Sequence, residues 1–407
     1  MEVDIAYGGS TINLKIPSSV NTDIFAPAIA DKPFGFEQFE TEFRTAGGIK
    51  RLSGDTILIV VNDAYRNTPT SLILEWLDRI DNQILDRARF LISTGAHQPS
   101  TKEQLQDIFK QFYDRIKPRL SIHNARDNST MLKLGVDNLN GNVLVNKAVA
   151  DNETVIVIGS VEPHYFAGYT GGRKSIFPGL TDPATIERNH NLANSLEAAP
   201  LKLKGNPVAE HLDSLMGFLD SQKFFGIQIV LDADHKIAGL YCGRLDASFT
   251  KATQLARKFF SHRVKKHYDA VICELLPPLD SNLYQVQKAL ENCQGVVRDG
   301  GAVILVSACK EGIGSEHFFQ QAKEWDRNRN RPIDGRLRFG SHKLSRVNAI
   351  SMRIHVYLYS DLSDAIVCHV FYEPLDNVKK FLFLVCSEDS LSDLAIVNDA
   401  GNTVLTI

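Results

Sequence analysis

The segment EPHYFAGYTGGRKSIFPG, at residues 162–179, combines residue types that could bind an anion and move a proton. It holds His164, four glycines, Arg173 and Lys174. Glycines let the backbone approach an anionic ligand closely, and Arg173 would supply positive charge beside it. A glycine-rich turn without a ligand would explain the glycines, but not the dense polar and basic residues among them.

A nucleoside-triphosphate loop is the first alternative for this segment. That motif needs the spacing G-x-x-x-x-G-K-[ST], so that backbone N–H groups surround the phosphates. If the motif starts at Gly168, Arg173 stands where the second glycine is required. Pro178 and Gly179 also interrupt the helix that would follow Lys174. The segment therefore disfavours a nucleoside triphosphate as its ligand.

Three of the twelve histidines lie at or beyond the ends of predicted elements: His97, His164 and His190. A single histidine is more often structural or exposed than catalytic, but three around one presumed crevice favour chemistry. Two bases with a pKa near neutrality suit a reaction that removes and returns a proton on either face of a substrate. HExxH is absent and no CxxC pair occurs, so the sequence does not predict a zinc site.

Two further pairs could hold a carboxylate. Asp63 and Arg66 follow a predicted strand, and the arginine fork suits bidentate carboxylate recognition. Gln285 and Lys288 are three residues apart, on one helix face near its start, where a carboxylate could also meet the helix dipole. The simpler alternatives are a surface ion pair for the first two residues and a solvated helix face for the second two.

Composition limits the function classes. A chain of 407 residues favours two or three domains, and its formal net charge of -3 does not indicate a nucleic-acid surface. The six cysteines lack a CxxC pair and several lie in or beside apolar runs, as in proteins of a reducing compartment. The N-terminal residues do not resemble a signal peptide, and no apolar run is long enough for a bilayer. We therefore expect a cytoplasmic protein that binds neither nucleic acid nor membrane.

The pattern of elements predicts two α/β domains with mainly parallel sheets, residues 1–262 and 263–407. The first domain alternates predicted strands and helices, as open parallel sheets do. Its strands are expected at 56–63, 87–95, 119–124, 154–160 and 225–232 and its helices at 69–80, 100–116, near 207–220 and at 246–262. The second domain is expected to hold a helix at 285–301 and strands at 267–274, 302–308, 354–360, 364–370 and 379–387.

Within this frame, we expect the helix at 100–116 to begin with a capping box of Ser100 and Glu103. In open parallel sheets, chemistry gathers at the carboxyl ends of the strands. That rule selects residues 63–66, 95–97 and the segment from Glu162 onward. The active site is expected in the cleft between the two domains, with the cofactor held by the first.

The segment 162–179 resembles the signature of the nickel-pincer-dependent lactate racemase family, PHYFAG followed by SGGRKS. The other motifs fall in the order that the family uses. Asp63 and Arg66 match its D-x-x-R element, His97 its G-x-H-x-P element, and His190 the histidine after the signature. The stretch from Tyr284 matches its Y-Q-x-x-K element.

The resemblance implies a racemase or epimerase that inverts C2 of a 2-hydroxy acid by reversible hydride transfer. It implies a nickel pincer nucleotide, a pyridinium-3,5-dithiocarboxylic acid mononucleotide nickel complex made by cofactor-synthesis enzymes, tethered covalently to Lys174. His190 would be the nickel ligand, and His97 and His164 the two acid/base groups. The remaining implied roles are cofactor binding for Gly171, Gly172, Arg173 and Asp63, and substrate binding for Arg66, Tyr284, Gln285 and Lys288.

Three positions depart from the family's common pattern. Many members read D-x-T-R-P and carry arginine after the first histidine, whereas this chain has Tyr65, Asn67 and Gln98. These changes favour a substrate bulkier or more polar than lactate, and lactate itself remains the alternative. A nucleotide-dependent dehydrogenase is a second alternative, although no G-x-G-x-x-G follows a strand. A non-catalytic cofactor-binding protein is a third, although His97 and His164 are both retained.

Overall fold

The computed structural model describes residues 1–32, 34–336, 338, 340–379, 381–382 and 391–407. The chain divides into two compact units. Unit 1 consists of residues 1–27, 163–166 and 260–407, and unit 2 of residues 28–162 and 167–259. The sequence-based division at 262 placed residues 1–27 in the first domain, whereas in the structure they form part of unit 1.

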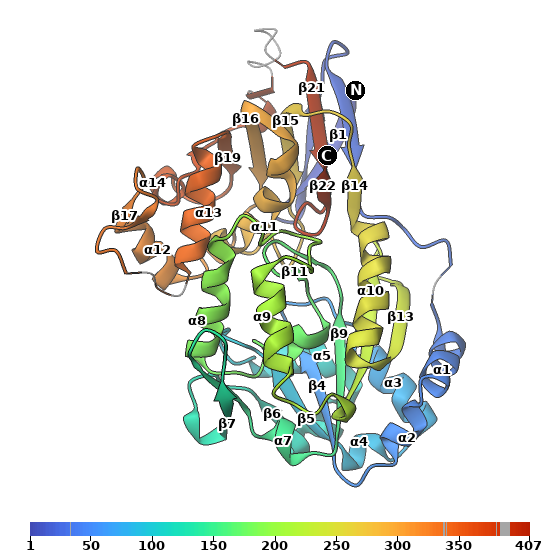
Figure 1. The fold of residues 1–407 in the computed structure, drawn as a ribbon. Helices are drawn as coiled ribbons and strands as arrows, with labels where there is room; N and C mark the ends of the chain where they lie inside the picture. Colours follow the sequence, from blue (N-terminus) through green and yellow to red (C-terminus); the bar gives the residue numbers. More distant parts are fainter. Residues whose placement is uncertain (33, 337, 339, 380, 383–390) are drawn as a thin grey trace. The chain divides into compact units, whose positions relative to one another are not determined.

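Unit 2 is built on a six-stranded sheet in the order β13-β12-β9-β4-β5-β6 (Figure 1). Its strands are β4 (Ile57–Asn62), β5 (Arg89–Ser93), β6 (Leu120–Ile122), β9 (Thr154–Ser160), β12 (Phe224–Leu231) and β13 (Ile237–Arg244). Every neighbouring pair is parallel except β12 with β13. The sequence predicted five of these strands, all except β13. Of these, β4, β9 and β12 are apolar runs buried on both faces, as in other parallel sheets.

Helices cover both faces of this sheet. Alternate residues of β4 point to opposite faces, so Ile59 packs in one core and Val60 in the other. The first core includes helices α1 (Phe36–Thr45), α3 (Thr70–Ile80) and α5 (Lys102–Phe109); the second includes α9 (Pro207–Met216) and the start of α10 (Leu245–Phe260). Shorter elements complete the unit: α2 (Gly48–Leu52), α4 (Ile84–Arg87), α6 (Tyr113–Ile116), β7 (Met131–Val136), β8 (Asn142–Asn146), α7 (Ala148–Asp151) and α8 (Pro183–Asn191).

The helix expected at 100–116 is wrong in its start and in its length. Its capping box uses Thr101 and Gln104 rather than Ser100 and Glu103. The Thr101 hydroxyl accepts from the Gln104 N–H at 3.3 Å, and the Gln104 side chain accepts from the Thr101 N–H at 3.0 Å. The helix α5 then ends at Phe109, and a short 3₁₀ turn separates it from α6. The apolar periodicity continues through this break, so it did not reveal the interruption.

Unit 1 is built on a second parallel sheet, in the order β20-β19-β16-β15-β21-β3. Its strands are β3 (Asn21–Phe25), β15 (Tyr268–Glu274), β16 (Val297–Val306), β19 (His355–Tyr359), β20 (Glu373–Pro374) and β21 (Asp393–Val397). Its helices are α11 (Leu283–Cys293), α12 (Glu316–Lys323), α13 (Ser341–Ser351) and α14 (Asp364–His369). Strands β1 (Glu2–Tyr7) and β2 (Ser10–Lys15) form an antiparallel pair, and β14 (Ser261–Arg263) pairs with β22 (Val404–Thr406). The two sheets confirm the predicted α/β class with mainly parallel strands.

Two expectations in this unit are wrong. The strand expected at 364–370 is helix α14, which spans Asp364–His369. Ser363 stands at its N-cap position, with Asp364 in the first turn and His369 in the last, which are helix signals that a short apolar run conceals. The helix expected at 285–301 ends at Cys293, and β16 begins at Val297. The strand expected at 379–387 lies largely outside the described residues.

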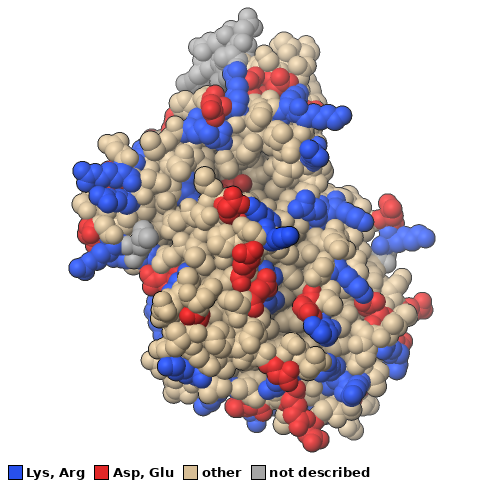
Figure 2. Space-filling view, in the orientation of Figure 1, with Lys and Arg blue, Asp and Glu red and all other residues tan. Residues whose placement is uncertain are grey.

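Two observations concern the exterior. Among the described residues, none of the helices is both long and apolar enough to cross a membrane. In the view of Figure 2, acidic and basic side chains are interspersed rather than gathered by sign.

Candidate active site

Most of the predicted site residues of unit 2 lie at or near the carboxyl edge of its sheet. Strand β4 has β5 on one side and β9 on the other, so the chain turns first to one side of β4 and later returns to the other. Such a reversal is the point at which open α/β sheets bind ligands. Asp63 follows β4, residues 94–97 follow β5, and the signature segment follows β9.

Asp63 and His97 form a pair at this edge. The Asp63 carboxylate oxygen Oδ2 lies 2.6 Å from Nδ1 of His97, while Oδ1 accepts from the backbone N–H of Tyr65 at 3.2 Å. A carboxylate at Nδ1 favours the tautomer that is protonated there, which leaves Nε2 as the basic nitrogen. Asp63 is buried, whereas the His97 side chain is 42% exposed and thus accessible to a substrate. The ring of Tyr65 packs edge-on against the imidazole, with centroids 4.8 Å apart.

The loop that carries His97 is attached to the signature segment. The Gly95 N–H donates to the carbonyl of Gly179 at 2.9 Å, and the Ser93 hydroxyl donates to the carbonyl of Ser175 at 2.8 Å. A Cβ at Gly179 would overlap the Ser93 hydroxyl, so this close approach requires glycine. Two segments far apart in the sequence are therefore fixed against each other.

The glycines of the signature have a packing role. Gly171 and Gly172 both have positive φ, at 74° and 54°, and a Cβ on Gly172 would lie 2.5 Å from the Phe249 ring. The Gly172 N–H donates to the side chain of Gln228 at 2.6 Å, and Gln228 in turn donates to the carbonyl of Val157 at 3.1 Å. Sequence reasoning missed Gln228, whose only signal was a polar residue inside the apolar run of β12.

Arg173 is directed at helix α9. Its Nε lies 2.6 Å from a carboxylate oxygen of Asp213, and its Nη2 donates to the carbonyl of Ala209 at 3.4 Å. The guanidinium also lies 5.0 Å from the centre of the Phe249 ring. Sequence reasoning missed Asp213 as well, because its pairing with the signature depends on tertiary structure. In the structure these contacts hold the signature turn against α9.

Lys174 lies in an environment that disfavours its charged form. Burial, together with the positive charges of Arg66 and Arg173, lowers the pKa of the Lys174 amine to about 7, while Asp63 opposes the shift. These influences mean that Lys174, Arg66 and Asp63 lie near one another in unit 2. The structure therefore brings Lys174 of the signature close to Asp63 and Arg66, which the sequence selected from a second motif.

His190 lies near the end of helix α8. Its Nδ1 is 2.8 Å from the carbonyl of Ile186, one turn earlier. A hydrogen bond from Nδ1 to that carbonyl gives the tautomer in which Nε2 carries the lone pair. No group of three or more histidine, cysteine, aspartate or glutamate side chains that could hold a metal ion occurs in the described part of the chain.

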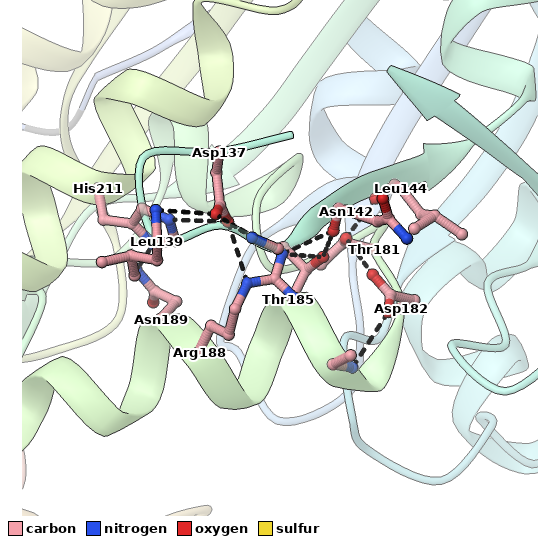
Figure 3. Close-up of polar contacts among 12 residues, drawn as sticks. Asp137, Leu139, Asn142, Leu144, Thr181, Asp182, Thr185, Arg188, Asn189 and His211 are labelled. Atoms are coloured by element: carbon pink, nitrogen blue, oxygen red, sulfur yellow. Dashed lines mark hydrogen bonds and ion pairs between the residues drawn. The ribbon is translucent and has the colours of Figure 1, made fainter. Parts of the chain in front are cut away.

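A buried polar network holds the opposite side of α8 (Figure 3). The Asp137 carboxylate accepts from Nε of Arg188 at 3.0 Å and lies 3.3 Å from Nε2 of His211. Asn189 donates to the carbonyl of Val208 at 3.1 Å, and its amide lies 3.2 Å from the second nitrogen of His211. Because Arg188 and Asn189 directly precede His190, this network fixes the turn of helix that carries it.

The remaining candidates lie in unit 1. His164 is buried between aromatic rings, with centroids 5.1 Å from Tyr165 and 4.5 Å from Phe166. Tyr284, Gln285 and Lys288 lie in the first turns of α11, which follows β15. Asn282 caps this helix by accepting the Gln285 N–H at 3.3 Å. Burial raises the pKa of Tyr165, and Tyr284 acts on it electrostatically in the same direction, so residues 163–166 of the signature and the start of α11 are neighbours within unit 1.

Two family models match the chain. The model described as "Lactate racemase N-terminal domain" matches residues 7–199, and that described as "Lactate racemase C-terminal domain" matches residues 267–335. Together they cover more than half of the chain.

The chain belongs to the lactate racemase family. This confirms the resemblance inferred from the motifs and makes the protein an isomerase. Among curated relatives, the lactate racemase of Lactiplantibacillus plantarum is 29% identical over 73% of this chain and 68% of its own length. That of Thermoanaerobacterium thermosaccharolyticum is 26% identical over 79% of this chain and 78% of its own length.

Solved structures show the lactate racemase fold. The lactate racemase apoprotein of Thermoanaerobacterium thermosaccharolyticum has a TM-score of 0.85 at 22% identity, with all of both chains covered. A protein from Thermotoga maritima has a TM-score of 0.74 at 14% identity, covering 93% of this chain and 100% of its own. At these identities the likeness describes the fold and leaves the site to be argued from this chain's own residues.

Proposed function

We propose that this racemase inverts C2 of a 2-hydroxy acid by reversible hydride transfer to a nickel pincer nucleotide tethered to Lys174. The observation that carries the proposal is the Lys174 amine, whose pKa falls to about 7 beside Asp63 and Arg66. A lysine in such a place is suited to covalent attachment rather than to an ion pair. In this proposal Lys174 and His190 would hold the cofactor, His164 would be an acid/base group, and the first turns of α11 would supply substrate contacts.

The residues present fit this cofactor. At neutral pH a large fraction of the Lys174 amine is uncharged and thus nucleophilic, and conversion to a thioamide removes the cost of burying a charge. His190 offers Nε2, with its lone pair, as the protein ligand for nickel, because Nδ1 is bonded to the Ile186 carbonyl. When bound, the group supplies a carbon that takes a hydride from the substrate and returns it.

The histidines move the hydroxyl proton. In our proposal, His97 accepts the proton of one enantiomer at Nε2, and the Asp63 carboxylate stabilises the resulting imidazolium through Nδ1. His164 donates the proton that the product of opposite configuration receives on its hydroxyl oxygen, and the two histidines exchange these roles when the reaction runs in reverse. The planar 2-oxo acid formed between these two steps has no stereocentre at C2, so return of the hydride on either face gives either product.

The carboxylate of the substrate is held by four side chains. Arg66 would provide the planar fork, and Tyr284, Gln285 and Lys288 would contribute from the start of α11. The amino end of a helix attracts anions, since its first N–H groups lack intrahelical partners. Binding of the carboxylate in this way would fix the position of C2. The C2 hydroxyl would then be accessible to the acid/base groups, and the C2 hydrogen to the cofactor.

The substrate side chain would contact the region of Tyr65. Tyr65, Asn67 and Gln98 replace residues common in the family, and this favours a substrate bulkier or more polar than lactate. Of the three, Tyr65 packs against the His97 ring, with centroids 4.8 Å apart. Lactate is the alternative, because the curated relatives are named for it. The five described cysteines are free, which supports a reducing compartment such as the cytoplasm.

The test is to express the protein together with the cofactor-synthesis enzymes and to measure inversion by chiral chromatography. The panel contains both enantiomers of lactate, malate, 2-hydroxyglutarate, phenyllactate and sugar acids. We expect intact-protein mass spectrometry to show an adduct on Lys174, and at least one acid to be inverted. An active preparation without the adduct overturns the tether, and a loaded protein that inverts none of the acids overturns the function.

A further inference from the structure

Lys343 is a buried lysine in unit 1 that the proposed mechanism does not use. It lies in the first turn of α13 and is 3% exposed. Its amine donates to the carbonyl of Tyr284 at 2.8 Å and lies 3.8 Å from the centre of the Tyr284 ring. The same amine lies 5.2 Å from the centre of the Tyr165 ring. Lysine is rarely buried so fully, so these contacts need an explanation.

Helix α11 presents one continuous face to this part of α13. Tyr284, Gln287 and Glu291 are spaced by three and four residues and so lie on one side of α11. The Gln287 side chain donates to the carbonyl of Lys343 at 3.2 Å. The Glu291 carboxylate accepts hydrogen bonds from Nε and Nη2 of Arg346, at 2.6 and 2.7 Å. The Glu291 carboxylate on this face is therefore paired with Arg346. The contacts of the Lys343 amine are instead with the Tyr284 carbonyl and the rings of Tyr284 and Tyr165.

Tyr165 brings the signature segment to the same amine. Its ring stacks on His164, with centroids 5.1 Å apart and an angle of 15° between planes. Lys343 thus contacts both a neighbour of His164 and the helix turn that carries Tyr284 and Gln285. These two segments are far apart in sequence, and the amine is a point at which they meet within unit 1.

We propose that Lys343 is a positioning residue that orients Tyr165 and Tyr284, and through them His164 and the carboxylate-binding turn of α11. A protonated amine attracts the faces of both rings, whereas the neutral amine retains only the hydrogen bond to the carbonyl. The functional part of this inference rests on the proposed function. The contacts themselves do not, and they can be tested without an assay.

The charge of Lys343 changes within the working range of an enzyme. Burial lowers the pKa of its amine to about 7, and Glu291 opposes that shift. The titratable and charged groups that face it are Tyr284 and Glu291 from α11, Arg346 from α13 and Tyr165 from the signature. As the pH rises through 7 the amine loses its charge and the rings lose their attraction to it. The hold on both segments should therefore weaken above neutrality.

The activity-free test uses ¹⁹F NMR of protein labelled with 3-fluorotyrosine, with the Tyr165 and Tyr284 signals assigned from Tyr→Phe variants. We expect both signals to titrate with a midpoint near pH 7 in the wild type and to shift without titrating in Lys343→Met. The matched control is Lys323→Met, since Lys323 is exposed but also lies over a ring, 5.0 Å from the centre of Phe319. Unchanged Tyr165 and Tyr284 signals in a folded Lys343→Met protein overturn the proposal.

The second test measures kcat and KM of the loaded enzyme against pH. Lys343→Met should lower kcat/KM about 10- to 100-fold, mainly through KM, and remove a decline of kcat/KM above pH 7. Lys343→Arg keeps a cation at every pH and should retain more activity without that decline. If the wild-type enzyme inverts no 2-hydroxy acid, the proposed function is overturned but the positioning role of Lys343 is not. The NMR titration still decides that role. Wild-type kinetics and pH profile in Lys343→Met overturn its functional part.

Discussion

Nδ1 of His97 and Oδ2 of Asp63 lie 2.6 Å apart at the carboxyl edge of the sheet of unit 2. The motif that contains Asp63 is compatible with two roles, to orient its neighbours or to bind the cofactor. The contact supports a role for Asp63 in orienting His97, since a carboxylate at Nδ1 favours the tautomer that is protonated there. Cofactor binding by Asp63, which the family resemblance implies, stays a prediction. The contact also makes the role of the pair testable by a change of one atom.

Asp63→Asn should lower kcat about 10- to 100-fold while leaving the Lys174 adduct in place, because it removes the charge that stabilises the His97 imidazolium. Steady-state rates and intact mass are measured on the same preparation. Asp55→Asn, which alters an exposed aspartate of the same unit, serves as the control. A kcat equal to that of the wild type would show that the pair does not support proton transfer.

Attachment of the cofactor should become faster as the pH rises. The pKa of Lys174 is lowered to about 7, so the nucleophilic, uncharged amine increases between pH 6 and 8 and then reaches a plateau. The apoprotein is incubated with the isolated cofactor across this range, and the adduct is followed by mass spectrometry. Attachment at a rate independent of pH contradicts the role of this amine, and Lys174→Arg should acquire no adduct.

His190→Ala should lose nickel and remain folded. The network of Asp137, Arg188 and His211 holds α8 from its other side, so removal of the imidazole leaves the helix in place. Elemental analysis compares this variant with His235→Ala, in which an exposed histidine of the same unit is removed. Nickel content at the wild-type level in His190→Ala would mean that this imidazole is not the ligand.

Arg66→Lys should lower kcat/KM by about 10- to 100-fold, equivalent to roughly 1.4–2.7 kcal/mol. Lysine keeps the charge but lacks the planar fork that binds both oxygens of a carboxylate. The variant is assayed with the best acid of the panel, alongside Arg126→Lys, which alters an exposed arginine of the same unit. If Arg66→Lys and Arg126→Lys have the same kcat/KM, Arg66 does not bind the substrate carboxylate.

Local sequence patterns predicted most of the central strands of both sheets. β4, β9 and β12 are continuous apolar runs, and such runs are typical of strands buried on both faces. The pairing of β3 with β21 was not foreseen. β3 is short and carries exposed residues, and its partner lies near the opposite end of the sequence. No local pattern indicates which distant strand an edge strand will join.

The residues of the candidate site also fall into two groups, those that sequence motifs identify and those that only the tertiary structure reveals. His97, Lys174 and His190 stand in motifs that the sequence displays, so residue type and spacing were enough to select them. Gln228 and Asp213 belong to no motif, and their partners become apparent only when the signature folds against β12 and α9. Residues that hold the candidate site in place are thus harder to predict than the candidate residues that stand in its motifs.

The pairing of β3 with β21 also affects the order in which the protein can fold during synthesis. β3 leaves the ribosome before any other strand of its sheet, and β21 leaves after all of them. Domains form as units during translation, so unit 2, residues 28–162 and 167–259, can fold before β3 has a partner strand. Its unpaired N–H and C=O groups stay open to wrong partners throughout that interval. Unit 1, although it contains the first residues of the sequence, is therefore the later of the two units to be completed.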